Sequence, residues 1–189
     1  SEPVLTVLPW EKQTELTILL NQKCNFSCSY CYSKNGRNHT VLNIDVIKTA
    51  LEQFISPKHG KSLSIVFSGG GDPLLSFEVF RKAVVYAREV AKHHGIDVEI
   101  GVVTNGSTLK QGCIDFIKSY NINLVISCDI LKDVHNSQRS HFDVVAATLD
   151  LLCAQGVQVG IRSTITPLNV NKMDEMVNEL IRRFPKVKG

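Results

Sequence analysis

Three cysteines lie close together in residues 23–32, which read KCNFSCSYCY. Cys24, Cys28 and Cys31 have the spacing C-x3-C-x2-C, and three thiolates in such a loop can bind three irons of a cubic iron–sulfur cluster. Four-iron clusters ordinarily take four cysteines, so a loop of three would leave one iron with a free coordination position. A free position distinguishes a reactive metal site from a structural one. The spacing therefore predicts a [4Fe-4S] cluster with one open iron.

The cysteines also allow two other interpretations. With His39, the clustered thiols could form a structural zinc site of three thiolates and one imidazole. They could instead be buried or disulfide-bonded cysteines, which short secreted chains use. The remaining cysteines, Cys113, Cys128 and Cys153, lie far apart in the sequence. We expect Cys128 and Cys153 in the core, a helix start near Cys113 that could lower its pKa, and a reducing cytoplasm around the protein.

A glycine-rich segment, SGGGDP at residues 68–73, joins an expected strand to an expected helix. Gly70 and Gly71 would let a ligand approach the backbone, and the N–H groups of the segment could form an anion-binding concavity. Asp72 could accept a hydrogen bond from a ligand ammonium. The alternative is an ordinary tight turn before a helix. A second short turn sequence, with Asn105 at its centre, follows the next strand.

A further polar group follows the fourth expected strand. Ser127 and Asp129 alternate along that strand, so both can face the same side, and Arg139 could bind a carboxylate with two parallel hydrogen bonds. A surface ion pair for Arg139 and a helix cap for Asp129 are the alternatives. We expect His135 to be a solvated loop residue. Arg162 stands on an otherwise apolar strand, either paired inside the molecule or pointing outward.

The segments between these groups alternate between two apolar patterns. Strands are expected over 15–21, 63–68, 98–104, 123–129 and 157–164, which are rich in β-branched and apolar residues. Amphipathic helices are expected to start near Ile44, Phe77, Phe142 and Met173, with a shorter helix around residues 114–117. Ser76 and Asn171 are placed to cap two of these helices, and Gly95 and Gly156 to end two others.

Five strand–helix units in series predict an α/β fold with a parallel sheet. A complete eight-unit barrel needs roughly 250 residues, so the chain of 189 residues is an incomplete barrel or an open doubly wound sheet. Barrel enzymes carry their reactive residues at the carboxyl ends of the strands. Every group described above falls at such an end. We expect residues 1–189 to be one domain, truncated at its C-terminus, because the chain begins with Ser1 and stops after a helix.

The composition of the chain limits the classes of partner that it is expected to bind. The chain is 43% hydrophobic, has a net charge of +3 and contains no block of basic residues. We therefore expect neither a nucleic acid nor a membrane as a main partner. The N-terminus lacks the pattern of a signal peptide, and no apolar run is long enough to span a bilayer, which favours a cytoplasmic location.

Taken together, these residues resemble those of radical S-adenosylmethionine (radical SAM) enzymes. Cys24-x3-Cys28-x-Tyr30-Cys31 matches the cluster motif of that family, with Tyr30 at its aromatic position. The segment 70–73 is similar to the Gly-Gly-Glu-Pro motif that holds the amino group of SAM. Two departures are an aspartate in place of the glutamate and an additional preceding glycine.

The resemblance implies a partial (β/α)6 barrel, of which this chain would contain about five units. It implies a [4Fe-4S] cluster held by the three cysteines, whose fourth iron binds the amino and carboxylate groups of SAM. One-electron reduction would then cleave a carbon–sulfur bond of SAM, and the resulting 5′-deoxyadenosyl radical would take a hydrogen atom from the substrate.

One branch of the family is resembled in particular. Residues 127–139 are similar to the S-x-D-G-P-x-x-x-H…R stretch of peptide- and protein-modifying members, although Ile130 and Leu131 replace the usual Gly-Pro. By this match Ser127 contacts the ribose of SAM and Arg139 its carboxylate. Residues 104–106 and 160–164 resemble the same branch, which often carries a C-terminal SPASM extension, and add the SAM-site candidates Asn105, Asp129 and Arg162.

The resemblance also implies partners. A peptide or protein substrate and a flavodoxin- or ferredoxin-like electron donor are expected. The alternatives are an activating enzyme that installs a glycyl radical on a partner protein and, from another class, a non-catalytic zinc-stabilised binding domain on the same scaffold.

Overall fold

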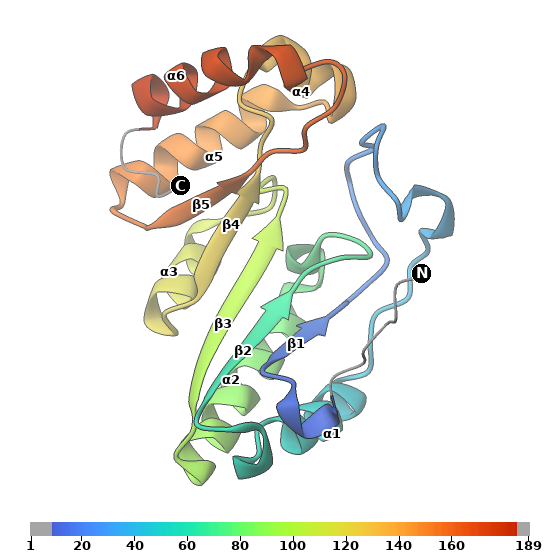
Figure 1. Ribbon diagram of the computed structural model, residues 1–189, viewed down its shortest axis with the longest axis vertical. Coiled ribbons are helices and arrows are strands. Elements are labelled where there is room, and N and C mark those ends of the chain that lie inside the picture. The colour runs from blue at the N-terminus through green and yellow to red at the C-terminus, as the bar shows by residue number, and fades with distance from the viewer. Residues whose placement is uncertain (1–8, 185–189) are drawn as a thin grey trace, which may run out of the picture.

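The computed structural model describes residues 9–184, and its centre is a sheet of five parallel strands. The strands are β1 (Glu15–Ile18), β2 (Ser62–Phe67), β3 (Asp97–Thr104), β4 (Asn123–Ser127) and β5 (Val159–Arg162), as Figure 1 shows. All five predicted strands are present. Four of them end earlier than predicted, because residues 19–21, 68, 128–129 and 163–164 lie beyond the strands, at the carboxyl edge of the sheet.

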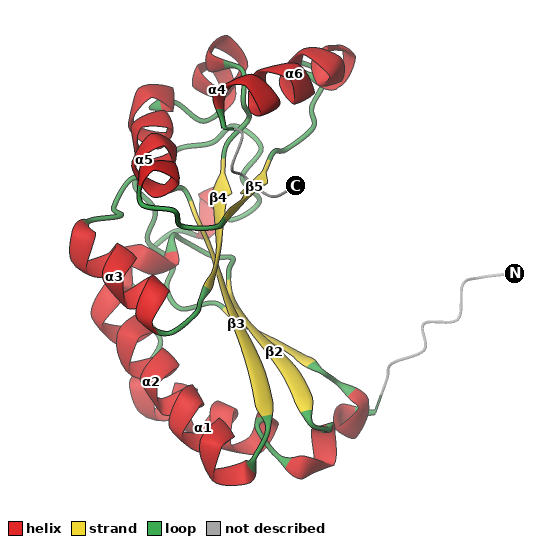
Figure 2. Ribbon diagram, turned by 90° about the vertical axis from the view of Figure 1, so that its left-hand side faces the viewer, coloured by secondary structure: helices red, strands yellow, loops and turns green. Residues whose placement is uncertain are grey.

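The helices lie between the strands in sequence. They are α1 (Ile44–Phe54), α2 (Phe77–His94), α3 (Gln111–Ser119), α4 (Lys132–Gln138), α5 (Phe142–Ala154) and α6 (Met173–Arg183). Figure 2 shows that α1, α2, α3 and α5 cover one face of the curved sheet. No helix in the described part of the chain has both the length and the apolar character that a membrane span requires.

The strand order decides between the two predicted architectures. Neighbours in the sheet follow the order of the chain, β1-β2-β3-β4-β5, and each pair is parallel. A doubly wound sheet reverses its strand order at a switch point and covers both faces with helices. The sequential order and the single helical layer are those of a barrel that is not closed. The prediction of a partial barrel is therefore confirmed.

The core lies between the sheet and its helices. Alternate residues of β2 and β3 point to the helical layer and are buried, for example Ile65, Phe67, Ile100 and Val102. The Phe67 and Phe80 rings meet edge to face with centroids 4.9 Å apart, which joins β2 to α2. This packing orders the strands, and the strands in turn fix the positions of the loops at their carboxyl ends.

The predicted helix ends are partly correct. Gly95 follows α2 in the left-handed conformation (φ 64°), as a helix-ending glycine does. Gly156 lies two residues beyond α5, also with positive φ. Asn171 does not cap α6, because it lies inside a 3₁₀ turn over Val170–Lys172. Ser76 occupies the N-cap position of α2 without a capping bond. Helix α4 was not predicted at all.

Candidate functional site

The cysteine loop, residues 22–40, is anchored at both ends beside β1. The carbonyl of Leu20 accepts a hydrogen bond from the Leu42 N–H at 2.9 Å. Asn21 and Val41 form an antiparallel bridge next to it. The loop contains no β-strand or α-helix of its own. These contacts at its base therefore hold it above the carboxyl edge of the sheet.

The three cysteines of this loop line one cavity of about 420 Å³. All three are free thiols; Cys28 is buried, and Cys24 and Cys31 are half-buried. The Cys31 N–H donates to the Cys28 carbonyl at 3.2 Å, which closes a turn between them. Burial raises the pKa of the Cys28 thiol, and the positive charge of Arg139 opposes this. Three separate thiols around one cavity fit a cluster in which each thiolate binds its own iron.

The same cavity collects the residues predicted from the other strand ends. Its walls include Tyr30, Gly70, Gly71, Asp72, Asn105, Ser127, Arg139 and Arg162. These residues come from the cysteine loop and from segments that follow or end β2, β3, β4 and β5. The structure therefore brings together every predicted site residue except Asp129, which lies behind the cavity wall.

The zinc interpretation requires a tighter arrangement. Thiolates that share a tetrahedral zinc ion at 2.3 Å stand about 3.8 Å apart. Within residues 9–184, no three His, Cys, Asp or Glu side chains are close enough to hold a single metal ion. His39 is exposed and lines a separate cavity of about 230 Å³ with Cys24, and neither Cys28 nor Cys31 lines that cavity. His39 is therefore not placed with Cys28 and Cys31.

The glycine-rich loop packs directly on the chain that leads into the cysteine loop. The Gly71 N–H donates to the Asn21 carbonyl at 2.9 Å, and the Asp72 N–H donates to the Lys23 carbonyl at 2.6 Å. The Gly70 N–H donates to the Tyr32 hydroxyl at 3.3 Å. These three N–H groups are therefore engaged within the protein. The prediction that these N–H groups form an anion-binding concavity is therefore wrong. The glycines instead allow the backbones of the two loops to lie in close contact.

Asp72 connects the ends of β2 and β3. Its carboxylate accepts hydrogen bonds from the Leu74 N–H at 3.0 Å, the Thr104 hydroxyl at 2.8 and 2.9 Å, and the Asn105 N–H at 2.6 Å. The side chain is buried, and burial raises the pKa of this carboxyl while the three donors oppose the shift. Asp72 therefore positions the backbone around Asn105, whatever contact it also makes with a ligand.

Asp129 joins the ends of β4 and β5. It is fully buried, and its carboxylate accepts hydrogen bonds from the Tyr30 hydroxyl (2.9 Å), the Gln138 amide (2.9 Å) and the Thr164 N–H (3.0 Å). Neither a helix cap nor a side chain facing the cavity describes this arrangement. Asp129 instead links the cysteine loop, α4 and the segment after β5.

Arg139 is a buried cation beside the cysteines. Its guanidinium donates to the Tyr30 hydroxyl at 2.7 Å, and it forms none of the ion pairs among the described residues. Its Nε atom is buried and has no hydrogen-bond partner in the described structure. The alternative of a surface ion pair is therefore wrong. Burial raises the pKa of Tyr30 to about 12, so the phenol stays neutral and can donate to Asp129.

Two predictions about single residues are wrong. His135 is not a solvated loop residue: it is fully buried in α4, and its Nδ1 accepts the Asp129 N–H at 3.2 Å. Burial, followed by the charge of Arg139, lowers the pKa of His135 to about 4. Cys113 lies in the first turn of α3 and is buried, as expected of a structural cysteine; burial raises its pKa to about 12, so the lowering that a helix start could cause is wrong. Of the two cysteines predicted in the core, Cys128 is buried and Cys153 is half-buried.

The loop after β4 contains a residue other than glycine in the left-handed backbone conformation that glycine usually adopts. Ile130 stands where the resembled family has glycine, and it adopts φ 63° in the left-handed region. This conformation is costly for a β-branched residue. The Ile130 side chain is buried, so its packing offsets the strain.

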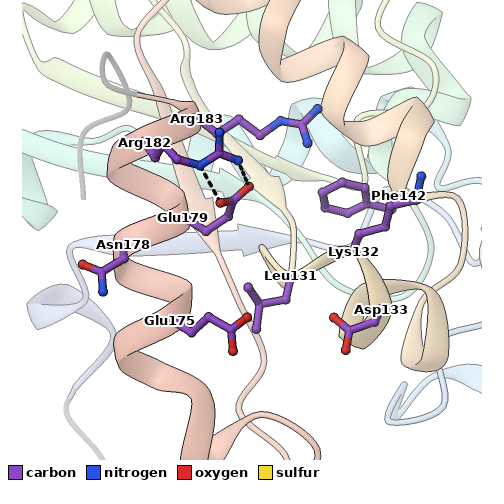
Figure 3. Close-up of a pocket in the computed structure, with 9 residues that line it drawn as sticks. All are labelled: Leu131, Lys132, Asp133, Phe142, Glu175, Asn178, Glu179, Arg182 and Arg183. Atoms are coloured by element: carbon purple, nitrogen blue, oxygen red, sulfur yellow. Dashed lines mark hydrogen bonds and ion pairs between the residues drawn. The ribbon is translucent and has the colours of Figure 1, made fainter.

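A larger cavity of about 560 Å³ lies away from the cysteines, between α6 and the starts of α4 and α5 (Figure 3). Two of its charged groups bond each other, Arg182 with Glu179 at 2.7 and 2.9 Å, and its Lys132 pairs at 2.8 Å with Asp143, which does not line the cavity. Exposed pairs of this kind contribute little free energy. No cysteine lines this cavity. Despite its larger volume, it lacks the reactive groups that the cysteine cavity contains.

The sequence did not point to two residues at the site. Arg37 contacts Cys31 and Gln138 holds Asp129, yet neither occupies a position of a recognisable motif. One signal existed for Arg37, because residues 16–44 contain no Asp or Glu that could pair with it.

An unclosed parallel barrel with three free cysteines at its carboxyl rim defines a class of α/β proteins that can hold a metal cofactor next to a ligand cavity. A family model described as the radical SAM superfamily matches residues 18–182. The chain belongs to this superfamily.

Individual relatives share this fold at low sequence identity. An uncharacterized protein of Methanocaldococcus jannaschii is 26% identical over 172 residues, which cover 88% of this chain and 58% of the relative. The solved structure of anSMEcpe with bound AdoMet and the Cp18Cys peptide has a TM-score of 0.78 at 19% identity. The match covers 93% of this chain and 50% of that one.

A second solved structure is SuiB of Streptococcus suis bound to the precursor peptide SuiA. Its TM-score is 0.71 at 18% identity, over 92% of this chain and 38% of SuiB. The chain thus spans about half the length of the proteins that it matches, and these similarities confirm the partial barrel fold.

Proposed function

We propose that this chain is the catalytic domain of a radical SAM enzyme that modifies a peptide or protein side chain. The observation that carries the proposal is the single cavity in which Cys24, Cys28 and Cys31 meet the glycine-rich loop and Arg139. In this proposal the three cysteines hold a [4Fe-4S] cluster. When bound, the cluster supplies one electron to SAM, and the resulting 5′-deoxyadenosyl radical takes a hydrogen atom from the substrate.

The residues of the cavity suit the charges of SAM. Arg139 is a buried guanidinium with an unpartnered Nε and no acidic partner among the described residues, so it can bind the SAM carboxylate. Its position is fixed by the neutral Tyr30, which in turn is fixed by Asp129. Ser127 lies opposite Arg162 in the β4–β5 register and lines the cavity, so its hydroxyl is available to the ribose of SAM.

The glycine-rich loop and Asn105 complete the proposed SAM site. Asp72 fixes the Asn105 N–H, and the Asn105 side chain lies 3.9 Å from the Cys24 sulfur. Gly70 and Gly71 also line the cavity, where they would face the amino group of SAM. Asp72 acts on SAM through the backbone that it positions.

A peptide or protein substrate is supported by the names of two structural neighbours, which were solved with the Cp18Cys peptide and with the precursor peptide SuiA. We further propose that the chain is part of a longer protein, that it works in a reducing cytoplasm, and that a flavodoxin- or ferredoxin-like protein supplies the electron. Free thiols at Cys24, Cys28, Cys31, Cys113 and Cys128 are consistent with a reducing compartment.

The proposal is tested by reconstituting the protein anaerobically with iron and sulfide and measuring bound iron, sulfide and zinc. We expect about four irons per chain. Adding SAM should then change the electron paramagnetic resonance (EPR) spectrum of the reduced cluster, and Arg139→Gln should weaken that effect. Zinc without iron uptake would contradict the proposal and favour the structural metal domain.

A further inference from the structure

Arg37 is the cation in contact with a cysteine of the loop. Its Nη2 lies 3.2 Å from the Cys31 sulfur, and its Nη1 donates to the carbonyl of Phe26. The two arms of the guanidinium therefore hold two points of the cysteine loop, five residues apart in sequence. Because the guanidinium is planar and rigid, this contact fixes the direction of the Cys31 side chain relative to the buried Phe26.

Among the described residues, Arg37 has no acidic partner for its charge. It forms none of the ion pairs among the described residues, and residues 16–44 contain no acidic side chain. Its Nε is buried and unpartnered in the described structure. Arg37 lines both the cysteine cavity and the smaller cavity that His39 lines. A half-buried cation in this position requires a nearby anion, and Cys31 is the group that it touches.

We propose that Arg37 is a positioning residue that holds Cys31 and makes the cluster easier to reduce. An N–H···S bond to a thiolate is charge-assisted and therefore stronger than a neutral one. Reduction adds one negative charge to the cluster, so a fixed positive charge next to a ligand stabilises the reduced form. The effect on reduction rests on the proposed function. The contact of Arg37 with both Cys31 and Phe26, which we call the clamp, does not rest on the proposed function, because the metal-free protein also forms it.

The experiment compares Arg37→Gln and Arg37→Lys with the wild-type protein. Lys34→Gln is the matched control, since it removes the same charge from the same loop at an exposed position without a side-chain contact to Cys31. Reduction potentials are measured by EPR-monitored titration of the reconstituted proteins with dithionite. Amide hydrogen exchange of residues 24–31 is measured by mass spectrometry on the metal-free proteins.

We expect Arg37→Gln to reduce the equilibrium constant for one-electron reduction about tenfold, which corresponds to a potential about 59 mV more negative. Arg37→Lys should shift the reduction potential much less, because it keeps the positive charge, but it should lose the simultaneous contact with Cys31 and Phe26. Exchange of residues 24–31 should be several-fold faster in both Arg37 variants and unchanged in Lys34→Gln.

Equal potentials for wild type and Arg37→Gln would overturn the redox part of the inference, and equal exchange rates would overturn the clamp. If even the wild-type protein takes up no iron, the proposed function fails. The exchange comparison still decides whether Arg37 holds the loop.

Discussion

Replacement of Gly71 by alanine should separate the glycine-rich loop from the cysteine loop. A Cβ at this position would stand 1.8 Å from the Lys23 carbonyl oxygen and 2.4 Å from the Asn21 Oδ1. The first neighbour is backbone, so it cannot turn aside as a flexible side chain would. The two loops must move apart, and the hydrogen bonds between them must lengthen or break.

The size of the effect follows from these bonds. Gly71 N–H to the Asn21 carbonyl, Asp72 N–H to the Lys23 carbonyl, and the Asn21 side-chain amide to the Asp72 carbonyl are 2.9, 2.6 and 2.9 Å long. At about 1 kcal/mol net for each bond, losing all three costs about 3 kcal/mol of stability. Because these bonds join the two halves of the site, the variant should also bind SAM poorly.

Gly112→Ala is the matched control. Gly112 lies in the first turn of α3, and a Cβ there would meet no heavy atom within 4 Å. Alanine is favoured over glycine in helices by up to about 1 kcal/mol, so this variant should be as stable as wild type or more stable. The free energies of unfolding are measured by urea denaturation of the metal-free proteins. A Gly71→Ala protein within 1 kcal/mol of wild type would show that the loops do not depend on their close contact.

Three further predictions concern single side chains. Cys28→Ala should abolish cluster assembly, measured as bound iron, while Cys153→Ala should not; a full cluster in Cys28→Ala would show that the ligand assignment is wrong. Burial lowers the pKa of His135 to about 4, below the usual 6.5, so the unfolded chain binds the proton more tightly and stability falls as the pH drops from about 6.5 to 4. The loss reaches about 3 kcal/mol at pH 4, so His135→Asn should flatten the pH dependence of urea unfolding. Tyr30→Phe removes a hydroxyl that bonds two buried partners and should cost about 1 to 3 kcal/mol in the same assay; a loss below 0.5 kcal/mol would contradict the network.

The sequence was sufficient to predict the strands of the fold and most of the residues around the cysteine cavity. The strands are short segments rich in β-branched and apolar residues, which predicts β-structure. Once the strands are known, parallel topology alone places their carboxyl ends at one edge. For this reason Cys24, Ser127 and Arg162, far apart in the chain, could be expected around one cavity.

The remaining features depend on contacts that no local pattern encodes. Helix α4 is only Lys132–Gln138 and carries a mostly polar sequence, so its periodicity was too short to recognise. The burial of His135 follows from its bond to the Asp129 backbone and its packing on Phe142, with ring centroids 5.3 Å apart. The engagement of the N–H groups around Gly71 likewise depends on the path of a loop 50 residues earlier in the chain.

The most direct test of the account is the reductive cleavage of SAM. The anaerobically reconstituted protein is incubated with dithionite and SAM, and 5′-deoxyadenosine and methionine are quantified with the Cys28→Ala protein as control. We expect the formation of 5′-deoxyadenosine to require both the reductant and Cys28, and to increase when a peptide substrate is present. A wild-type protein that carries about four irons, binds SAM and still forms no 5′-deoxyadenosine, with or without peptide, would contradict it.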